Sequence, residues 1–180
     1  MKLLILDRAG IINEPRDTII GTPDDCVPIP GSSEAIARLC HAGYRIVIAA
    51  FRTGLESGTV DLDTLNRIHD KLQICGVAAG GHLDALFFSP TSTSAVSEHE
   101  RRMELFREIA DRLNIDLTTV TTIGASAGVV RSARAAGASA VLLRTGLANT
   151  VPVPECESVE LFDNLSSFTD AFLSLNGMGA

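Results

Sequence analysis

The sequence lacks several features that would place it in a specialised class of protein. Its four cysteines, Cys26, Cys40, Cys75 and Cys156, are far apart and form no C-x-x-C pair, which argues against a zinc knuckle or a disulfide framework. No apolar run approaches the roughly 18 residues that a membrane span needs, and the stretch before Asp7 is too short for a signal peptide. We therefore expect a soluble, cytoplasmic protein with reduced thiols and no membrane partner.

Positive charge is also scarce. The chain has 15 Lys and Arg against 22 Asp and Glu, a formal net charge of -7. Nucleic acid phosphates select surfaces rich in Lys and Arg, so nucleic acid is not an expected partner. There is no internal repeat and no low-complexity tract. A length of 180 residues suits one domain with a substantial core, and we expect a single domain over residues 1–180.

Short apolar runs recur along the chain and alternate with segments of helical periodicity. This alternation predicts βαβ units with right-handed crossovers, hence an α/β fold with a doubly wound parallel sheet in three layers. Pro152 and Pro154 precede a VELF run and an amphipathic segment, so residues 147–180 are expected to add a C-terminal strand and helix. The other expected strands are Leu3–Leu6, Arg45–Ala50, Leu83–Phe88, Val120–Gly124 and Ala140–Leu143.

Capping residues mark the expected helix starts. Ser32 or Ser33 is a candidate cap for the first helix, and Asp61 for the second. Ser97 followed by Glu100 has the spacing of a capping box. Residues 8–30 contain four prolines, which exclude regular helix and predict a long loop above the end of the first strand.

Asp7 follows the first apolar run directly. Such a run is typical of a buried central strand, and in an open α/β sheet ligands bind outside the carboxyl ends of the strands. Asp7 is therefore the leading candidate for a functional residue.

The segments around Asp7 resemble a known family. LILDRAGIIN is similar to the first motif, D-x-D-G after a hydrophobic strand, of the haloacid dehalogenase-like (HAD) phosphatases. INEP, IPGSSEAIARL, AGYRIVIA and the stretch around Gly124 resemble the small D-glycero-D-manno-heptose 1,7-bisphosphate phosphatases and the related histidinol-phosphatases. The likeness runs over residues 1–146 and implies a HAD-like Rossmannoid fold without a separate cap domain, in which the loop 8–30 covers the active site.

The resemblance also implies which residues would carry the chemistry. Asp7 matches the nucleophile that attacks phosphorus. Four other positions carry residues that lack the chemistry of the family. These are Ala9 for the general acid and base, Ala50 for a hydroxyl that contacts the phosphoryl group, Glu100 for a lysine, and Ala125 for a magnesium-binding carboxylate. Arg101 or Arg102, next to Glu100, are the cations that could reach inward instead.

The same resemblance bears on metal ions. Ala9 and Ala125 offer no side-chain oxygen to Mg²⁺, which leaves the Asp7 carboxylate alone. The zinc loop of the heptose phosphatases is absent, since Ser89, Thr91, Val96 and Glu98 stand at its ligand positions. We therefore expect no metal site and no cofactor.

These losses favour a catalytically degenerate protein, a pseudophosphatase that acts by protein interaction or regulation, with an unknown protein partner or by self-association. One alternative is a module that binds a phosphorylated sugar or another anion through Arg8, Arg52, Gly124 and Ser126. The other is an active phosphatase with altered chemistry that uses Asp7, with His99 as proton donor.

Overall fold

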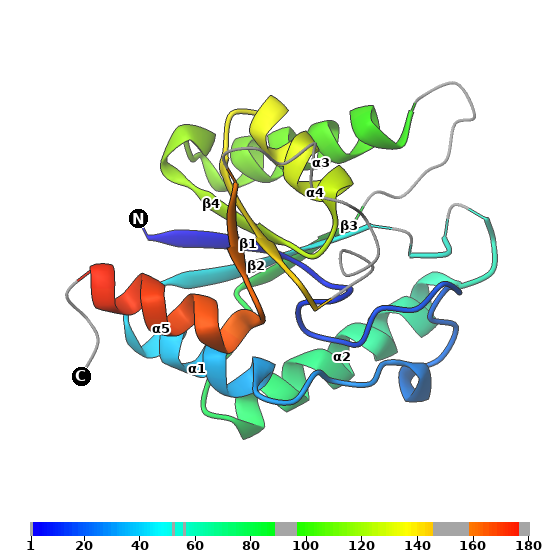
Figure 1. Ribbon diagram of the computed structural model, residues 1–180. Coiled ribbons are helices and arrows are strands. Elements are labelled where there is room, and N and C mark those ends of the chain that lie inside the picture. The colour runs from blue at the N-terminus through cyan, green and yellow to red at the C-terminus, as the bar shows by residue number, and fades with distance from the viewer. Residues whose placement is uncertain (1, 52, 56, 89–96, 146–158, 177–180) are drawn as a thin grey trace.

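A parallel sheet forms the centre of the molecule (Figure 1). The computed structural model describes residues 2–51, 53–55, 57–88, 97–145 and 159–176. Within these residues the sheet has six strands in the order β3-β2-β1-β4-β5-β6, all pairs parallel. The expected α/β class with a doubly wound sheet is confirmed. The strands are β1 (Leu3–Asp7), β2 (Arg45–Ala50), β3 (Ala85–Phe88), β4 (Thr121–Gly124), β5 (Ser139–Leu143) and β6 (Glu160–Phe162).

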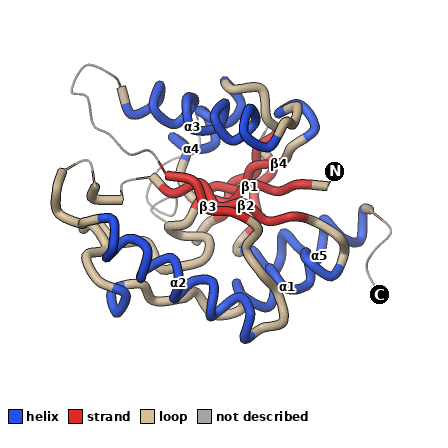
Figure 2. Tube along the Cα trace, turned by 180° about the vertical axis from the view of Figure 1, so that it is seen from behind, coloured by secondary structure: helices blue, strands red, loops and turns tan. Residues whose placement is uncertain are grey.

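Helices cover both faces of the sheet, which gives the three layers (Figures 1 and 2). α1 (Ser32–His41), α2 (Leu62–Ala78) and α5 (Leu165–Leu175) lie on one face, while α3 (Glu98–Leu113) and α4 (Ala127–Ala135) lie on the other. Each face has its own buried apolar cluster. Short 3₁₀ turns occur at Pro23–Asp25 and Leu117–Thr119. In the part of the chain described, no helix is long and apolar enough to cross a membrane.

The helix starts agree with the sequence at two of three places. Asp61 accepts a hydrogen bond from the Thr64 amide, and Ser97 forms the capping box with Glu100. The expectation of a serine cap on α1 is wrong, because Gly31 occupies the cap position with a φ of 82°. The Ser32 hydroxyl instead donates to the carbonyl oxygen of Ile11, at 2.6 Å. This serine therefore fastens the preceding loop.

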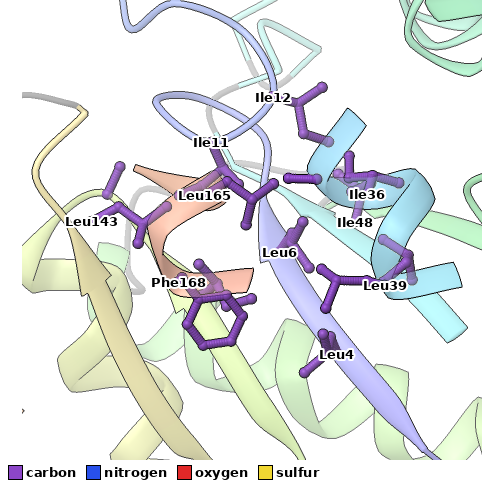
Figure 3. Close-up of a cluster of buried hydrophobic side chains, with 14 of the residues drawn as sticks. Leu4, Leu6, Ile11, Ile12, Ile36, Leu39, Ile48, Leu143, Leu165 and Phe168 are labelled. Carbon is purple, nitrogen blue, oxygen red and sulfur yellow. The ribbon is translucent and has the colours of Figure 1, made fainter. Parts of the chain in front are cut away.

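The loop of residues 8–31 packs into the core of the molecule. Its two arms pair, because the Glu14 amide donates to Val27 and the Ile29 amide donates to Ile12, at 2.8 and 2.9 Å. Figure 3 shows Ile11 and Ile12 in the same buried cluster as Ile36 of α1. These contacts hold the loop above the carboxyl end of β1, as the sequence predicts.

Candidate active site

A cavity of about 280 Å³ lies at the edge of the sheet where the strands end. Residues 7–9 line it after β1, and residues 125 and 126 line it after β4. Strand order reverses at β1, since β2 lies on one side of it and β4 on the other. Loop residues 13, 15, 16 and 18–20 also line it. The cavity therefore occupies the switch point at which open α/β sheets bind ligands.

Asp7 is the last residue of β1, and its carboxyl group lines this cavity. Its side chain is buried, with 8% of the residue exposed. Oδ1 accepts a hydrogen bond from the Arg8 amide at 2.7 Å. Burial raises the pKa of Asp7 to about 6, although that amide and the charge of Arg102 both favour the ionised form. At neutral pH the group is therefore an ionised carboxylate in a poorly solvated place.

Arg102 of α3 supplies positive charge to the same cavity. Its side chain is 14% exposed and pairs with Glu98 one turn earlier on the helix. The guanidinium carbon lies 5.6 Å from the ring centroid of Phe51, which also lines the cavity. Of the two arginines that could reach inward near Glu100, Arg102 is the one that lines the cavity.

The residues expected to bind an anion divide into three groups. Arg8 and Ser126 line the cavity, and Ser126 also accepts a hydrogen bond from the Val129 amide as the cap of α4. Gly124 ends β4 outside the cavity lining, and a Cβ atom there would lie 3.0 Å from Cγ1 of Val129. Arg52 lies outside the described residues.

Of the four positions that lack the family's catalytic side chains, two line the cavity and two do not. Ala9 and Ala125 line the cavity together with Asp7. Ala50 is fully buried in β2 and lines no part of the cavity. Glu100 is exposed and bonded to Ser97 at the start of α3, so its carboxylate does not repel an anion in the cavity.

His99, the expected proton donor, lies outside the cavity lining. Its Nδ1 is 2.8 Å from the Ser132 hydroxyl on α4. The helical pattern of the sequence predicted α3, but it did not show that the His99 side chain contacts α4 instead of the cavity.

Sequence reasoning missed three polar side chains of the site, those of Asn13, Arg16 and Thr18. Asn13 is fully buried in the cavity lining, and its Oδ1 has no hydrogen-bond partner among the described residues. Arg16 lies in the lining as well and pairs with Asp25 at 2.7 Å. The four prolines predicted a loop over the end of the strand, but they did not show which of its side chains line the cavity.

The fold and the site together define a class. A doubly wound parallel sheet that carries an aspartate at the end of its central strand, under a loop rather than a cap domain, is the architecture of the capless HAD phosphatases.

Comparison with known proteins defines the family. No family model matches the chain. It is 37% identical over 147 residues to D-glycero-beta-D-manno-heptose-1,7-bisphosphate 7-phosphatase of Bordetella bronchiseptica, covering 81% of this chain and 82% of that protein. The phosphatase of the same name from Pseudomonas aeruginosa is 34% identical over 173 residues, covering 95% and 97%. The crystal structure of the B. bronchiseptica D,D-heptose 1,7-bisphosphate phosphatase with magnesium and phosphate superposes with a TM-score of 0.87 at 33% identity, covering 97% of this chain and 99% of that one. The chain belongs to the heptose 1,7-bisphosphate phosphatase family of the HAD superfamily.

Family membership corrects the expectation of a pseudophosphatase that is not an enzyme. That expectation is wrong, because the relatives aligned along most of the chain are heptose-bisphosphate 7-phosphatases. The sequence showed missing side chains one position at a time, whereas the folded chain keeps the Asp7 carboxylate in a cavity with arginines.

The expectation that no cofactor is used is also wrong, since the B. bronchiseptica relative is complexed with magnesium. In this chain two carboxylates line the cavity, those of Asp7 and Glu98. Within the described ranges no group of three or more His, Cys, Asp or Glu could hold a metal ion by itself. Mg²⁺ is commonly bound by one or two carboxylates together with substrate phosphate and water. The residues present fit that manner of binding, with Asp7 as the carboxylate that would hold the ion.

Of the four positions at which the zinc ligands of the family are expected to be absent, the structure describes one, Glu98. Glu98 is the first residue of α3 and pairs with Arg102. Ser89, Thr91 and Val96 lie outside the described residues.

Proposed function

We propose that this protein is a phosphatase that hydrolyses a phosphorylated sugar, with heptose 1,7-bisphosphate as the first substrate to test. The observation that carries the proposal is the position of Asp7, at the end of the central strand and on the wall of the cavity. The names of the relatives support the choice of substrate.

The charges around the cavity support an anionic ligand. Arg8, Arg16 and Arg102 contribute three positive charges to its lining, against two negative charges from Asp7 and Glu98. The first turn of α4 begins at the same wall, and its backbone N–H groups favour an anion there. A phosphate ester therefore meets a net positive surface in a chain that is acidic as a whole.

The reaction proceeds in two displacements. An Asp7 carboxylate oxygen attacks phosphorus, the bond from phosphorus to the sugar oxygen breaks, and the sugar alkoxide takes a proton from water. Water then attacks the aspartyl phosphate, which releases inorganic phosphate and restores Asp7. Mg²⁺, when bound, neutralises phosphate charge. Because Ala9 offers no proton, we expect turnover about 10²–10⁴-fold slower than with a positioned acid.

The test is phosphate release from heptose 1,7-bisphosphate with Mg²⁺ present. We expect turnover in the unchanged protein and none in Asp7→Asn, whose amide is a poor nucleophile. Turnover should rise with pH through about 6, since the Asp7 carboxyl must be ionised to attack. Release that is equal in the protein and in Asp7→Asn would contradict the proposal.

We further propose a cytoplasmic location, supported by the unpaired thiols of Cys26, Cys40 and Cys75. The single domain over residues 1–180, with residues 147–180 as an extension, stays a prediction.

A further inference from the structure

Arg102 on α3 is a cation that lines the cavity together with Asp7. The sequence contains two lysines, Lys2 and Lys71, and neither lies in the cavity lining. The Lys2 ammonium lies 5.2 Å from the Tyr44 ring centroid, while Lys71 donates to the Pro23 carbonyl oxygen at 2.7 Å. The basic side chains that line the cavity and could contact a phosphoryl group are therefore arginines.

Arg102 is held in a defined position. Glu98 pairs with its guanidinium from one turn earlier on α3. Phe51, the residue after β2, lies under the guanidinium, and the Phe51 ring packs edge-on against Phe106, with ring centroids 5.7 Å apart. Held on both sides, the guanidinium loses little further freedom when it binds a ligand.

Gly128 provides the space that Arg102 occupies. A Cβ atom at position 128 would lie 2.6 Å from Nη1 of Arg102, closer than real Cβ contacts. Gly128 is the second residue of α4, in the first turn after the Ser126 cap. The guanidinium therefore lies against the positive end of a helix, an arrangement that repels unless an anion is bound between them.

The guanidinium also has hydrogen-bonding capacity to spare. Its Nε is buried and has no hydrogen-bond partner among the described residues. A buried donor without a partner costs free energy that a ligand oxygen can recover. Since Arg102 lines the cavity together with Asp7, and its charge favours ionised Asp7, a phosphoryl group attacked by Asp7 lies within its field.

We propose that Arg102 binds the phosphoryl group of the substrate and stabilises the charge on its oxygens during transfer to Asp7. Glu98 and Phe51 act as positioning residues, and Gly128 supplies the space. This role rests on the proposed phosphatase function. It places the phosphate-binding cation two residues beyond Glu100, the position at which the family resemblance implies a lysine.

The test compares Arg102→Ala with a matched control on the same helix. Arg112→Ala removes an arginine that also pairs one turn back, with Glu108, and that also lies over a phenyl ring, Phe87, but it is 67% exposed and outside the cavity lining. We expect kcat/KM to fall about 10²–10³-fold in Arg102→Ala. In Arg112→Ala it should stay within about two-fold. Arg102→Lys should recover part of the loss, because lysine keeps the charge but not the planar fork.

Binding of inorganic phosphate with Mg²⁺, followed by calorimetry, separates this inference from the proposed function. If phosphate binds more weakly to Arg102→Ala while the unchanged protein shows no turnover, the phosphatase proposal fails and takes the role in phosphoryl transfer with it, whereas phosphate binding by Arg102 stands. If Arg102→Ala matches the unchanged protein in both turnover and phosphate affinity, the role of Arg102 is overturned and the function stands.

A second variant guards against an effect of misfolding. Gly128→Ala keeps the guanidinium but fills its space, so phosphate affinity should fall although no charge is lost. Added to Arg102→Ala, it should cause no further fall, since the group it displaces is already absent. A further fall of the same size in the double variant would overturn the assignment.

Discussion

The methyl group at position 9 limits what Asp7 can do. Asp7 and Ala9 both line the cavity, so a carboxyl group at position 9 would lie in the same cavity as the Asp7 carboxylate. The family resemblance implies an aspartate there as general acid and base. No such group replaces it among the cavity-lining residues, because Glu98 is engaged with Arg102.

Ala9→Asp should therefore increase turnover. A positioned acid that protonates the leaving sugar oxygen contributes about 10²–10⁴-fold to the rate, and we expect kcat to rise within that range. Phosphate release with Mg²⁺ measures it, and Ala9→Asn, which has the same size but no acidic proton, is the control. An equal increase in Ala9→Asn would show that the effect is not acid catalysis.

Asp7→Asn should stabilise the fold in a pH-dependent way. Burial raises the pKa of Asp7 from 3.8 to about 6, so between these values the folded state binds more protons than the unfolded state. The contribution of Asp7 to the free energy of unfolding therefore falls as pH rises through this window. Two pKa units correspond to about 3 kcal/mol as an upper value. We expect Asp7→Asn to gain up to this amount at pH 8 and little at pH 4, measured by urea unfolding at both values.

At the scale of elements, the loop of residues 8–31 is fastened to its surroundings at several points. Lys71 of α2 donates to the Pro23 carbonyl oxygen, and the Thr145 hydroxyl donates to the carbonyl oxygen of Gly10. Gly54 forms a third point, since its φ of 86° brings the backbone against Ile19 of the loop. Because Ile19 lines the cavity, this packing shapes the site.

Gly54→Ala should destabilise the protein by about 2–4 kcal/mol. A Cβ atom at position 54 would lie 2.7 Å from Cγ2 of Ile19, and the positive φ adds strain. Gly58→Ala is the matched control, because Gly58 has a φ of 69° with nothing within 4 Å of an added Cβ. Chemical unfolding should show a cost at least 1 kcal/mol larger at position 54 than at position 58. Equal costs would mean that the loop does not pack tightly against Gly54.

The sequence predicted elements better than it predicted side-chain directions. Apolar runs located the strands to within two residues because the sheet is buried on both faces. Position alone could not show that Ser32 bonds to the Ile11 carbonyl, since that contact joins residues 21 apart. Likewise, counting back along α3 put Glu100 at the family's lysine position, whereas the helix turns Arg102 toward the cavity. Tertiary packing decides such directions, and one sequence does not display it.

At the scale of the whole molecule, strand order places the site. β1 lies between β2 and β4, so the first crossover leads to one half of the sheet and the later strands build the other half. The end of β1 is the only strand end flanked by both halves, among the strands that the structure describes. Asp7 was predictable as a site residue because the central strand and its terminal carboxylate are adjacent in the sequence. Its partners come from α3, α4 and the loop, which only folding brings together.

Mg²⁺ and phosphate should stabilise the whole molecule jointly rather than separately. The negative charge of ionised Asp7 repels phosphate, and the positive charge of Arg102 repels Mg²⁺. When both ions are bound, Mg²⁺ offsets the charge of Asp7 and phosphate offsets the charge of Arg102, so each ion favours binding of the other. Ligands that bind the folded state raise its stability, and their mutual effect on affinity is reciprocal. We expect the melting temperature to rise more with both ions present than the sum of the two separate increases, and a chelator to remove this excess. Asp7→Asn, which lacks the carboxylate charge, should show no increase in melting temperature beyond the sum of the two separate increases. A purely additive response in the unchanged protein would contradict phosphate-assisted binding of Mg²⁺.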